Sequence, residues 1–160
     1  MINRFAIAIT TFVLPLIATL HFTSSAMASD FGSAEEAQTM LERAVEAMNN
    51  DEAAALASFT AGTDGFKDRD LYVACFEQGV EDNAGKMTAH GGLPTLVGTL
   101  ASEIVDQKGT NLGQLLDVDT QGKIEIATYW WPRPGETEAA EKESFFVTVG
   151  SHNCLVGYYK

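Results

Sequence analysis

The sequence predicts an α+β domain with an antiparallel sheet, and its segments are arranged in a way that supports this prediction. Two segments with helical periodicity come first, between Ser33 and Phe59. Segments with strand character follow, and the last three of them come directly after one another. A parallel α/β fold would instead alternate helices with strands one by one. Helices that lie before and between the strands therefore indicate an α+β arrangement.

The first predicted helix begins at Ser33. Residues 33–36 form a capping box, in which the Ser33 side chain caps the helix and Glu36 reaches back to its start. Apolar residues then recur at the spacing of one helical face, which we expect to pack on the sheet. They are Ala37, Met40, Leu41, Ala44, Val45 and Met48. This helix ends at Asn50, and Asp51 caps a second helix that runs to about Phe59.

Residues 70–77 are predicted to form a central strand, because apolar side chains occur on both of its alternating faces. A short strand is expected at residues 86–90, and residues 95–106 form a mixed connection. Residues 111–118 suit a short helix. Three strands at residues 123–131, 141–149 and 152–159 complete the chain, and Gly150-Ser151 suits a tight hairpin turn between the last two.

Residues 117–122 imitate the start of a calcium loop. Gln121 replaces an acid at the fifth position, and Thr128 stands where the bidentate glutamate belongs. We therefore interpret this segment as a turn and expect no calcium.

Residues 1–28 have the features of a secretory signal peptide. A short polar region with Arg4 precedes a largely apolar stretch from Phe5 to Leu20, and Ala26-Met27-Ala28 is an A-x-A cleavage site. The alternative is a membrane anchor, but threonines and Pro15 interrupt the stretch, and an uninterrupted span needs about 20 apolar residues. The sequence predicts a periplasmic or secreted protein whose mature chain, residues 29–160, forms one domain.

The chain is strongly acidic. Loss of Arg4 with the signal peptide would change the formal net charge from −12 to −13. Such a charge argues against binding to nucleic acid and to anionic membranes, and it identifies no partner.

The mature chain has two cysteines, Cys75 and Cys154. In an oxidising compartment, two cysteines in one small domain usually pair. The alternatives are free thiols and a zinc site completed by His90 or His152. No C-x-x-C or H-x-x-x-H spacing supports zinc, and we expect no metal and no cofactor.

The segment Tyr129-Trp130-Trp131-Pro132-Arg133-Pro134 contains both tryptophans and two of the four prolines of the chain. Tyr and Trp offer an apolar ring and one polar group, which suits a pocket for a small molecule with Arg133 at its rim. The alternative is that these aromatic side chains fill the core at the end of a strand.

Several short segments occur in a particular order along the mature chain. They are residues 66–73, Ala89-His90 with Leu96-Val97-Gly98, residues 106–109, 129–134, 141–145 and 156–160. They resemble the F-x-x-x-D-L-Y-V, A-H-P…L-V-G, D-x-x-G, Y-x-W-P-x-P, P-K-S-S-Y and V-G-x-G-I-Y segments of single Cache domains, the extracytoplasmic relatives of PAS sensor domains. No single segment identifies this family, but the six segments in this order do. Two departures are Gly91 in place of a proline and Phe145 in place of a tyrosine, which would remove one hydroxyl from a ligand shell.

The resemblance implies a PAS/Cache-like five-stranded antiparallel sheet with a long N-terminal helix packed on one face. A ligand cavity would lie on the opposite face. The first and last strands would be neighbours, so the resemblance and the paired cysteines together imply a cross-strand Cys75–Cys154 disulfide.

Related domains bind small carboxylates, amino acids or amines. The resemblance implies a ligand set in which Lys142 and Arg133 supply charge, Tyr129 and Tyr72 donate hydrogen bonds, and Trp131 forms an apolar wall. His90 would complete the set as a further donor. Each also has a structural interpretation: Lys142 and Arg133 as solvated charges, and His90 as a hydrogen-bonded structural residue. Alternation places Tyr129 and Trp131 on one face of their strand, and Lys142 and Ser144 on one face of the next, without showing that the two faces are the same.

The sequence features bear on three classes of function. The favoured one is an exported sensor-type domain that binds a small anionic metabolite, such as a carboxylate, or an amino acid, without its own output module. The alternative is a ligand-free, Cache-like interaction module that docks on a membrane receptor or transporter. An enzyme is not expected, because the chain has no G-x-S-x-G, H-E-x-x-H or phosphate-binding glycine loop.

Overall fold

A computed structural model describes residues 29–78 and 85–160. The predicted signal peptide, including its cleavage site, lies outside the described residues. The helices are α1 (Ala34–Asn50), α2 (Glu52–Ala61) and α3 (Leu112–Leu116), with short 3-10 turns η2 (Pro94–Leu96) and η3 (Ala101–Glu103). The strands are β1 (Lys67–Asp68), β2 (Leu71–Glu77), β3 (Met87–His90), β4 (Glu125–Pro132), β5 (Ala139–Val149) and β6 (His152–Tyr159). No helix in the described part is long and apolar enough to cross a membrane.

The N-terminal helices begin where the capping residues predict. The Glu36 backbone N–H donates to Ser33 Oγ at 3.2 Å, and the Ser33 backbone N–H donates to Glu36 Oε2 at 2.8 Å, which completes the capping box. Asp51 caps α2 by accepting from the Ala54 backbone N–H at 3.1 Å. The α2 helix ends at Gly62, whose φ of 67° lies in the left-handed region that glycine adopts most easily. The start of α1 and both ends of α2 are therefore determined by residues that are close to them in the sequence.

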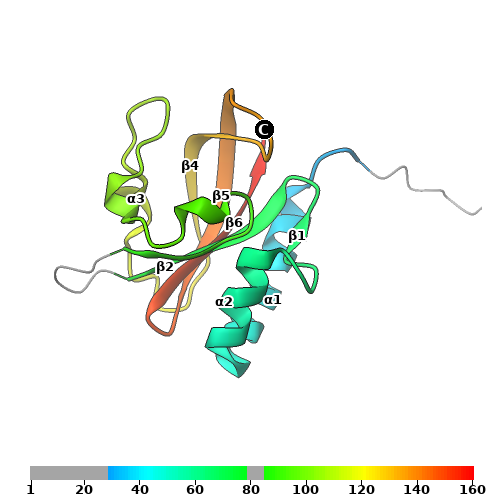
Figure 1. Cartoon of the computed structure of the whole chain (residues 1–160), viewed down its shortest axis with the longest axis vertical. Coiled ribbons are helices and arrows are strands. Elements are labelled where there is room, and N and C mark those ends of the chain that lie inside the picture. Colours follow the sequence, from blue (N-terminus) through cyan, green and yellow to red (C-terminus); the bar gives the residue numbers. More distant parts are fainter. Residues whose placement is uncertain (1–28, 79–84) are drawn as a thin grey trace, which may run out of the picture.

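The strands form one antiparallel sheet with the order β1-β2-β6-β5-β4, and β3 pairs with β2 (Figure 1). The first long strand, β2, and the last strand, β6, are neighbours, as the family resemblance implies. The two-residue strand β1 is an addition to the predicted five strands. The connection after β3, which showed a mixed pattern, forms the turns η2 and η3.

One face of the sheet is covered by α1 and α2 (Figure 1). The apolar side of α1 lies against Val73 and Val156, and Phe59 of α2 is fully buried. Cys75 stands directly opposite Cys154 in the β2–β6 register, and the two sulfur atoms are joined at 2.09 Å. The structure thus confirms the predicted disulfide, within the helix-covered core.

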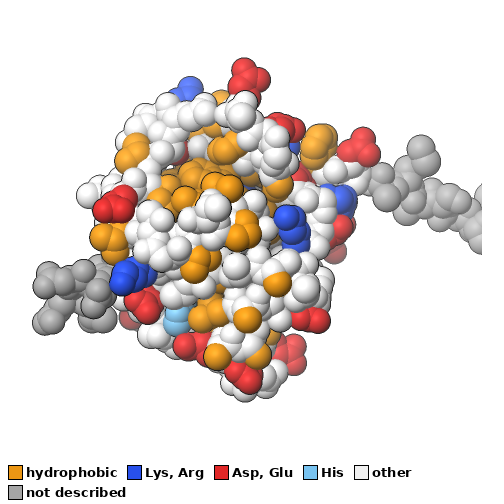
Figure 2. Space-filling model, viewed as in Figure 1, with side chains coloured by type: hydrophobic (Ala, Val, Ile, Leu, Met, Phe, Trp, Pro, Cys, Tyr) orange, Lys and Arg blue, Asp and Glu red, His pale blue; other side chains and the backbone are white. Residues whose placement is uncertain are grey.

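The other face of the sheet carries a second apolar cluster, which includes Phe76, Tyr129, Phe146 and Leu155. It is covered by α3 and by residues of η3, such as Ala101. Hydrophobic side chains gather in a hollow beside α3 and β4 on this side of the molecule (Figure 2). This face therefore has the cavity that the family resemblance implies.

Candidate functional site

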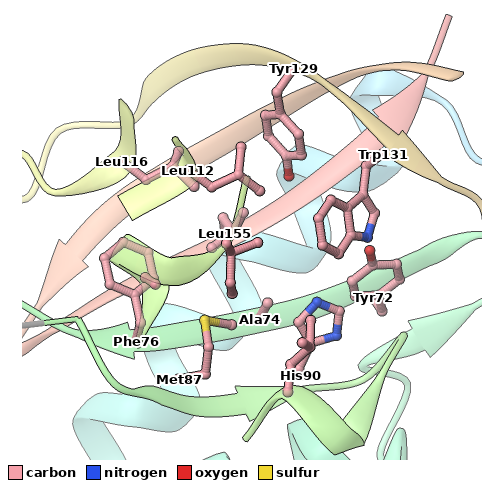
Figure 3. Close-up of a pocket in the computed structure, with 13 residues that line it drawn as sticks. Tyr72, Ala74, Phe76, Met87, His90, Leu112, Leu116, Tyr129, Trp131 and Leu155 are labelled. Carbon is pink, nitrogen blue, oxygen red and sulfur yellow. The ribbon is translucent and has the colours of Figure 1, made fainter. Parts of the chain in front are cut away.

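The cavity lies between the sheet and the segment that contains η2, η3 and α3. It has a volume of about 40 Å³. Since a single buried water needs roughly 10–15 Å³ by this kind of measure, the cavity has room for a few non-hydrogen atoms. Most of its lining is apolar, and the four lining residues with polar side-chain atoms stand toward one end, where Figure 3 shows three of them close together. These four are Tyr72, His90, Tyr129 and Trp131.

The register of the last three strands brings the predicted site residues together. Tyr129 on β4 stands opposite Lys142 on β5, and Lys142 stands opposite Tyr159 on β6. Opposite residues of an antiparallel pair point to the same face of the sheet. Tyr129, Trp131, Lys142 and Ser144 therefore share the cavity-side face, which sequence alternation alone left open.

Lys142 is buried, with a residue exposure of 1%. Its Nζ lies 3.9 Å from the centre of the Tyr72 ring and 4.8 Å from the centre of the Tyr159 ring. Burial lowers the pKa of Lys142 to about 7, and the nearby negative charge of Asp70 opposes this shift. Lys142 is thus a buried cation rather than a solvated one, and the Tyr72 ring shields it, because Lys142 is not among the residues that line the cavity.

A glycine on β6 makes room for this lysine. A Cβ atom at Gly157 would lie 2.5 Å from Lys142 Cε and 3.0 Å from the Glu143 backbone oxygen, and closer still to Ser144 Oγ. Any side chain at position 157 would therefore push Lys142 and Ser144 away from the sheet. The match of Gly157 to the closing family motif thus has a physical reason.

His90 lines the cavity from β3 and is uncharged. Its Nδ1 accepts a hydrogen bond from the Leu93 backbone N–H at 2.8 Å. Burial, followed by the charge of Lys142, lowers the pKa of His90 to about 3. A neutral imidazole that accepts at Nδ1 carries its proton on Nε2. His90 therefore has the structural role considered for it, because it holds the turn to Leu93 through Nδ1, while its role as a donor to a ligand stays a prediction.

Tyr129 and Tyr72 present hydroxyl groups on this face. The Tyr129 hydroxyl and Ser144 Oγ are 2.8 Å apart, and burial raises the pKa of Tyr129 to about 12. Burial also raises the pKa of Tyr72 well above its usual value, while a hydrogen bond from Trp131 opposes this shift. Figure 3 shows the Tyr72 hydroxyl and the Trp131 indole nitrogen turned toward each other. Both phenols stay protonated near neutral pH and can donate hydrogen bonds.

Arg133 does not project into bulk water, which corrects the solvated interpretation. Its guanidinium carbon lies 4.8 Å from the ring centres of both Phe31 and Tyr159, and its Nε lies 3.8 Å from Asp70 Oδ2. Arg133 lines an outer pocket of about 80 Å³, which shares Tyr72 and Trp131 with the inner cavity. The structure therefore places Arg133 in the outer pocket beside Tyr72 and Trp131, and not in the lining of the inner cavity.

Two aromatic residues lie on the helix side of the sheet. Trp130 is next to Trp131 in β4, so its side chain points to the opposite face of the sheet. Lys108 Nζ lies 4.3 Å from the centre of a Trp130 ring. Phe145 belongs to the helix-side core and stacks on Tyr158 at 6.2 Å. The expectation that Phe145 costs the ligand shell a hydroxyl was therefore wrong, because this position faces α1.

Sequence reasoning did not assign a role to Asp70, Ser144, Gly157 or Tyr159. The Tyr159 hydroxyl donates to the Pro132 carbonyl oxygen at 2.7 Å and joins the end of β6 to the end of β4. Of these four residues, strand alternation in the sequence points only to Ser144, which shares a face with Lys142. The positions of the other three depend on the β5–β6 and β2–β6 pairings, which the sequence does not reveal. Within residues 29–78 and 85–160, no group of three His, Cys, Asp or Glu side chains is arranged to hold a metal ion.

The sequence was also compared with known proteins. The profile of the family described as single Cache domain 2 matches residues 13–159. The chain belongs to the single Cache domain 2 family. The suspected family and the α+β, Cache-like fold are thus confirmed. The match begins inside the predicted signal peptide, so the boundary at Ala28 stays a prediction. Among curated proteins, none matches the chain.

Solved Cache-type structures have the same fold. A methyl-accepting chemotaxis protein from Vibrio parahaemolyticus is 18% identical, with a TM-score of 0.61 over 78% of this chain and 86% of that chain. A periplasmic sensor domain of a chemotaxis protein is 23% identical, with a TM-score of 0.57 over 78% and 88%. A Cache chemosensory domain described for carboxylic acid recognition is 17% identical, with a TM-score of 0.61 over 79% and 92%. At these identities the likeness establishes the fold alone. Domains of this family are extracytoplasmic sensor and binding modules.

Proposed function

We propose that this Cache domain acts outside the cytoplasm, in the periplasm or beyond, and binds a small carboxylate with a short apolar tail. The tail would occupy the cavity among Phe76, Met87 and Leu155. The carboxylate would lie at the polar end of the cavity, where Tyr72, His90, Tyr129 and Trp131 carry their polar atoms. The observation that carries the proposal is Lys142, a buried cation beneath the Tyr72 ring on the same side of the sheet.

The chemistry of the cavity favours this ligand over an amino acid. The polar groups that line it are N–H and O–H groups, and no Asp or Glu is among the described residues of its lining. An α-ammonium group would enter the cavity without a counter-ion, which is costly in an apolar site. A carboxylate, in contrast, needs donors and a cation. The volume of about 40 Å³ favours an acid of a few carbons. Support also comes from the neighbour described for carboxylic acid recognition.

The test is calorimetric titration of the purified domain with propionate, and with propionamide as a neutral compound of the same shape. We expect propionate to bind and propionamide to bind much more weakly. Lys142→Met should weaken propionate binding by roughly 10-fold, because it removes a buried positive charge that attracts the carboxylate from behind the Tyr72 ring without touching it. Tyr129→Phe should weaken it by a smaller factor, since it removes a neutral donor.

Lys123→Met is the matched control, because Lys123 is exposed and precedes β4. It removes the same charge and should leave propionate affinity unchanged. Equal loss of affinity in Lys142→Met and Lys123→Met would mean that only the overall charge matters. Equal binding of propionate and propionamide would contradict a carboxylate site. Absence of any binding, together with capture of a membrane receptor or transporter, would favour the docking module instead.

A further inference from the structure

Asp106 is a buried carboxylate in the turn between η3 and α3, and the function proposed above does not use it. It is 6% exposed. Its Oδ1 accepts hydrogen bonds from the backbone N–H groups of Lys108 and Thr110, both at 2.8 Å, which hold the turn together. Its Oδ2 points out of this turn and accepts from the Trp130 backbone N–H on β4 at 2.9 Å. One carboxylate therefore joins two segments that are distant in the chain.

The Trp130 N–H group is available for this bond because β4 is the last strand in the sheet order. In an antiparallel pair, the N–H and C=O groups of one residue point to the same side, and those of the next residue point to the other. The bond to Asp106 shows that the N–H of Trp130 points away from β5. Asp106 therefore binds the free edge of β4, between the cavity-lining residues Tyr129 and Trp131.

This bond connects two walls of the cavity. One wall is the cover, which we define as residues 94–116, and its Ile104 and Leu112 line the cavity. The other wall is β4, which contributes Tyr129 and Trp131. The apolar hollow in Figure 2 lies beside α3 and β4, and these two elements belong to the two walls that the bond joins. The bond is thus placed where the two walls could separate.

The cover has separate hydrogen bonds along each of its borders. Toward β3, the Gly98 N–H donates to the Met87 carbonyl oxygen at 2.8 Å, and the Met87 N–H donates to the Thr99 carbonyl oxygen at 2.9 Å. Toward β6, Asn153 Nδ2 donates to the Leu116 carbonyl oxygen at 3.1 Å. Toward β4, the carboxylate described above makes the only hydrogen bond between the cover and this strand among the described residues. Loss of that bond would free the border along β4 and leave the other two attached.

We propose that Asp106 is a positioning residue that fastens the cover to β4 and thereby limits how fast small molecules enter and leave the cavity. A carboxylate suits this role, because its hydrogen bonds with N–H groups are stronger than those of a neutral acceptor. Asp106 does not line the cavity, so it acts on a ligand through the cover and not by contact. The inference rests on the function proposed above for the identity of the ligand.

The test compares Asp106→Asn with Asp119→Asn. An asparagine at position 106 keeps one carbonyl oxygen that can accept hydrogen bonds within the turn, but its NH₂ group cannot accept from the Trp130 N–H. Asp119 is exposed, and its Oδ1 accepts from the Gln121 N–H at 2.9 Å within its own turn. Both substitutions remove one negative charge from a turn, so the bond to β4 is what distinguishes them.

The first measurement needs no carboxylate. Met87 lines the cavity from β3 and is buried, so hydrogen peroxide converts it to the sulfoxide only as fast as peroxide reaches the cavity. Met40 and Met48 are similarly buried in the helix-side core and serve as internal references. Mass spectrometry should show Met87 oxidised roughly 10-fold faster in Asp106→Asn than in the wild-type protein or Asp119→Asn, because one hydrogen bond to a charged group is lost.

The reference methionines separate this role from a merely structural one. Met40 and Met48 should be oxidised at the wild-type rate in Asp106→Asn, because they lie on the opposite face of the sheet. A substitution that only destabilises the whole domain would accelerate the oxidation of all three methionines. Unchanged oxidation of Met87 in Asp106→Asn would overturn the role of Asp106.

The second measurement follows propionate by stopped-flow tryptophan fluorescence, since Trp131 lines the cavity. Entry and exit use the same opening, so the association and dissociation rate constants should both rise roughly 10-fold in Asp106→Asn, with little change in affinity. Loss of a residue that contacts the ligand would instead change mainly the dissociation rate. Unchanged rate constants would also overturn the role of Asp106. Failure of propionate to bind the wild-type protein would overturn the proposed function, and Met87 oxidation would then decide the role of Asp106 by itself.

Discussion

On the face covered by α1 and α2, Val73 and Val156 of the central strands pack into an apolar core, whereas on the other face Tyr72 lines a cavity with the buried Lys142 behind its ring. Val73 is adjacent to Tyr72 in the chain, so the two environments differ only by the alternation of one strand. The first face gains its stability from close packing and a disulfide. The second retains empty space and buried charge, both of which reduce stability. Stability and ligand binding are thus assigned to opposite faces of one sheet.

The largest effect that separates the two faces should come from the disulfide. It joins residues with a sequence separation of 79. In the chain-entropy model, opening a loop of this length costs about 4–5 kcal/mol of unfolding free energy. The variant in which both Cys75 and Cys154 are changed to Ala should lose about that much in chemical denaturation. Propionate affinity, measured where the variant is still folded, should be unchanged, because the bridge lies on the helix side. A loss of affinity without a loss of stability would contradict the division between the faces.

A smaller effect is expected from one leucine on each face. Leu41 of α1 is fully buried in the helix-covered core, whereas Leu155 lines the cavity. Leu41→Ala should cost about 3–5 kcal/mol, and Leu155→Ala about 2 kcal/mol, because part of the Leu155 surface already faces empty space and has fewer contacts to lose. Chemical denaturation measures both. Only Leu155→Ala should change the preferred length of the carboxylate, by enlarging the cavity. Equal destabilisation by the two variants would show that both faces are packed alike.

The sequence predicted the elements of this fold well, because their signals are local. The Ser33 capping box, the Asp51 cap and the Gly150-Ser151 turn depend on neighbouring residues alone. Residues 95–106 were less predictable, since η2 and η3 are single turns with little periodicity. The disulfide required two kinds of information, the chemistry of paired cysteines and the strand order implied by the family resemblance.

The candidate site was predictable only in part. Strand alternation grouped Tyr129 with Trp131, and Lys142 with Ser144, but it did not show that both pairs face the cavity. That fact depends on the β4–β5 register, which is a long-range property. The position of Asp70 was still less predictable, because nothing in its local sequence reveals its proximity to Arg133. Arg133 was expected in water for a similar reason: Phe31 and Tyr159, which enclose it, are distant in the chain.

The most direct measurement of the central claim is the location of the ligand on the protein. Intermolecular NOEs from the methyl group of ¹³C-labelled propionate to the domain provide it. Binding in the cavity predicts NOEs to Leu155 and Trp131, both of which line it, with none to the helix-side residues Leu41 and Val156. NOEs confined to Phe31 and Leu93, which are exposed at the outer surface, would contradict the account, as would bound propionate that shows no NOE to the cavity lining.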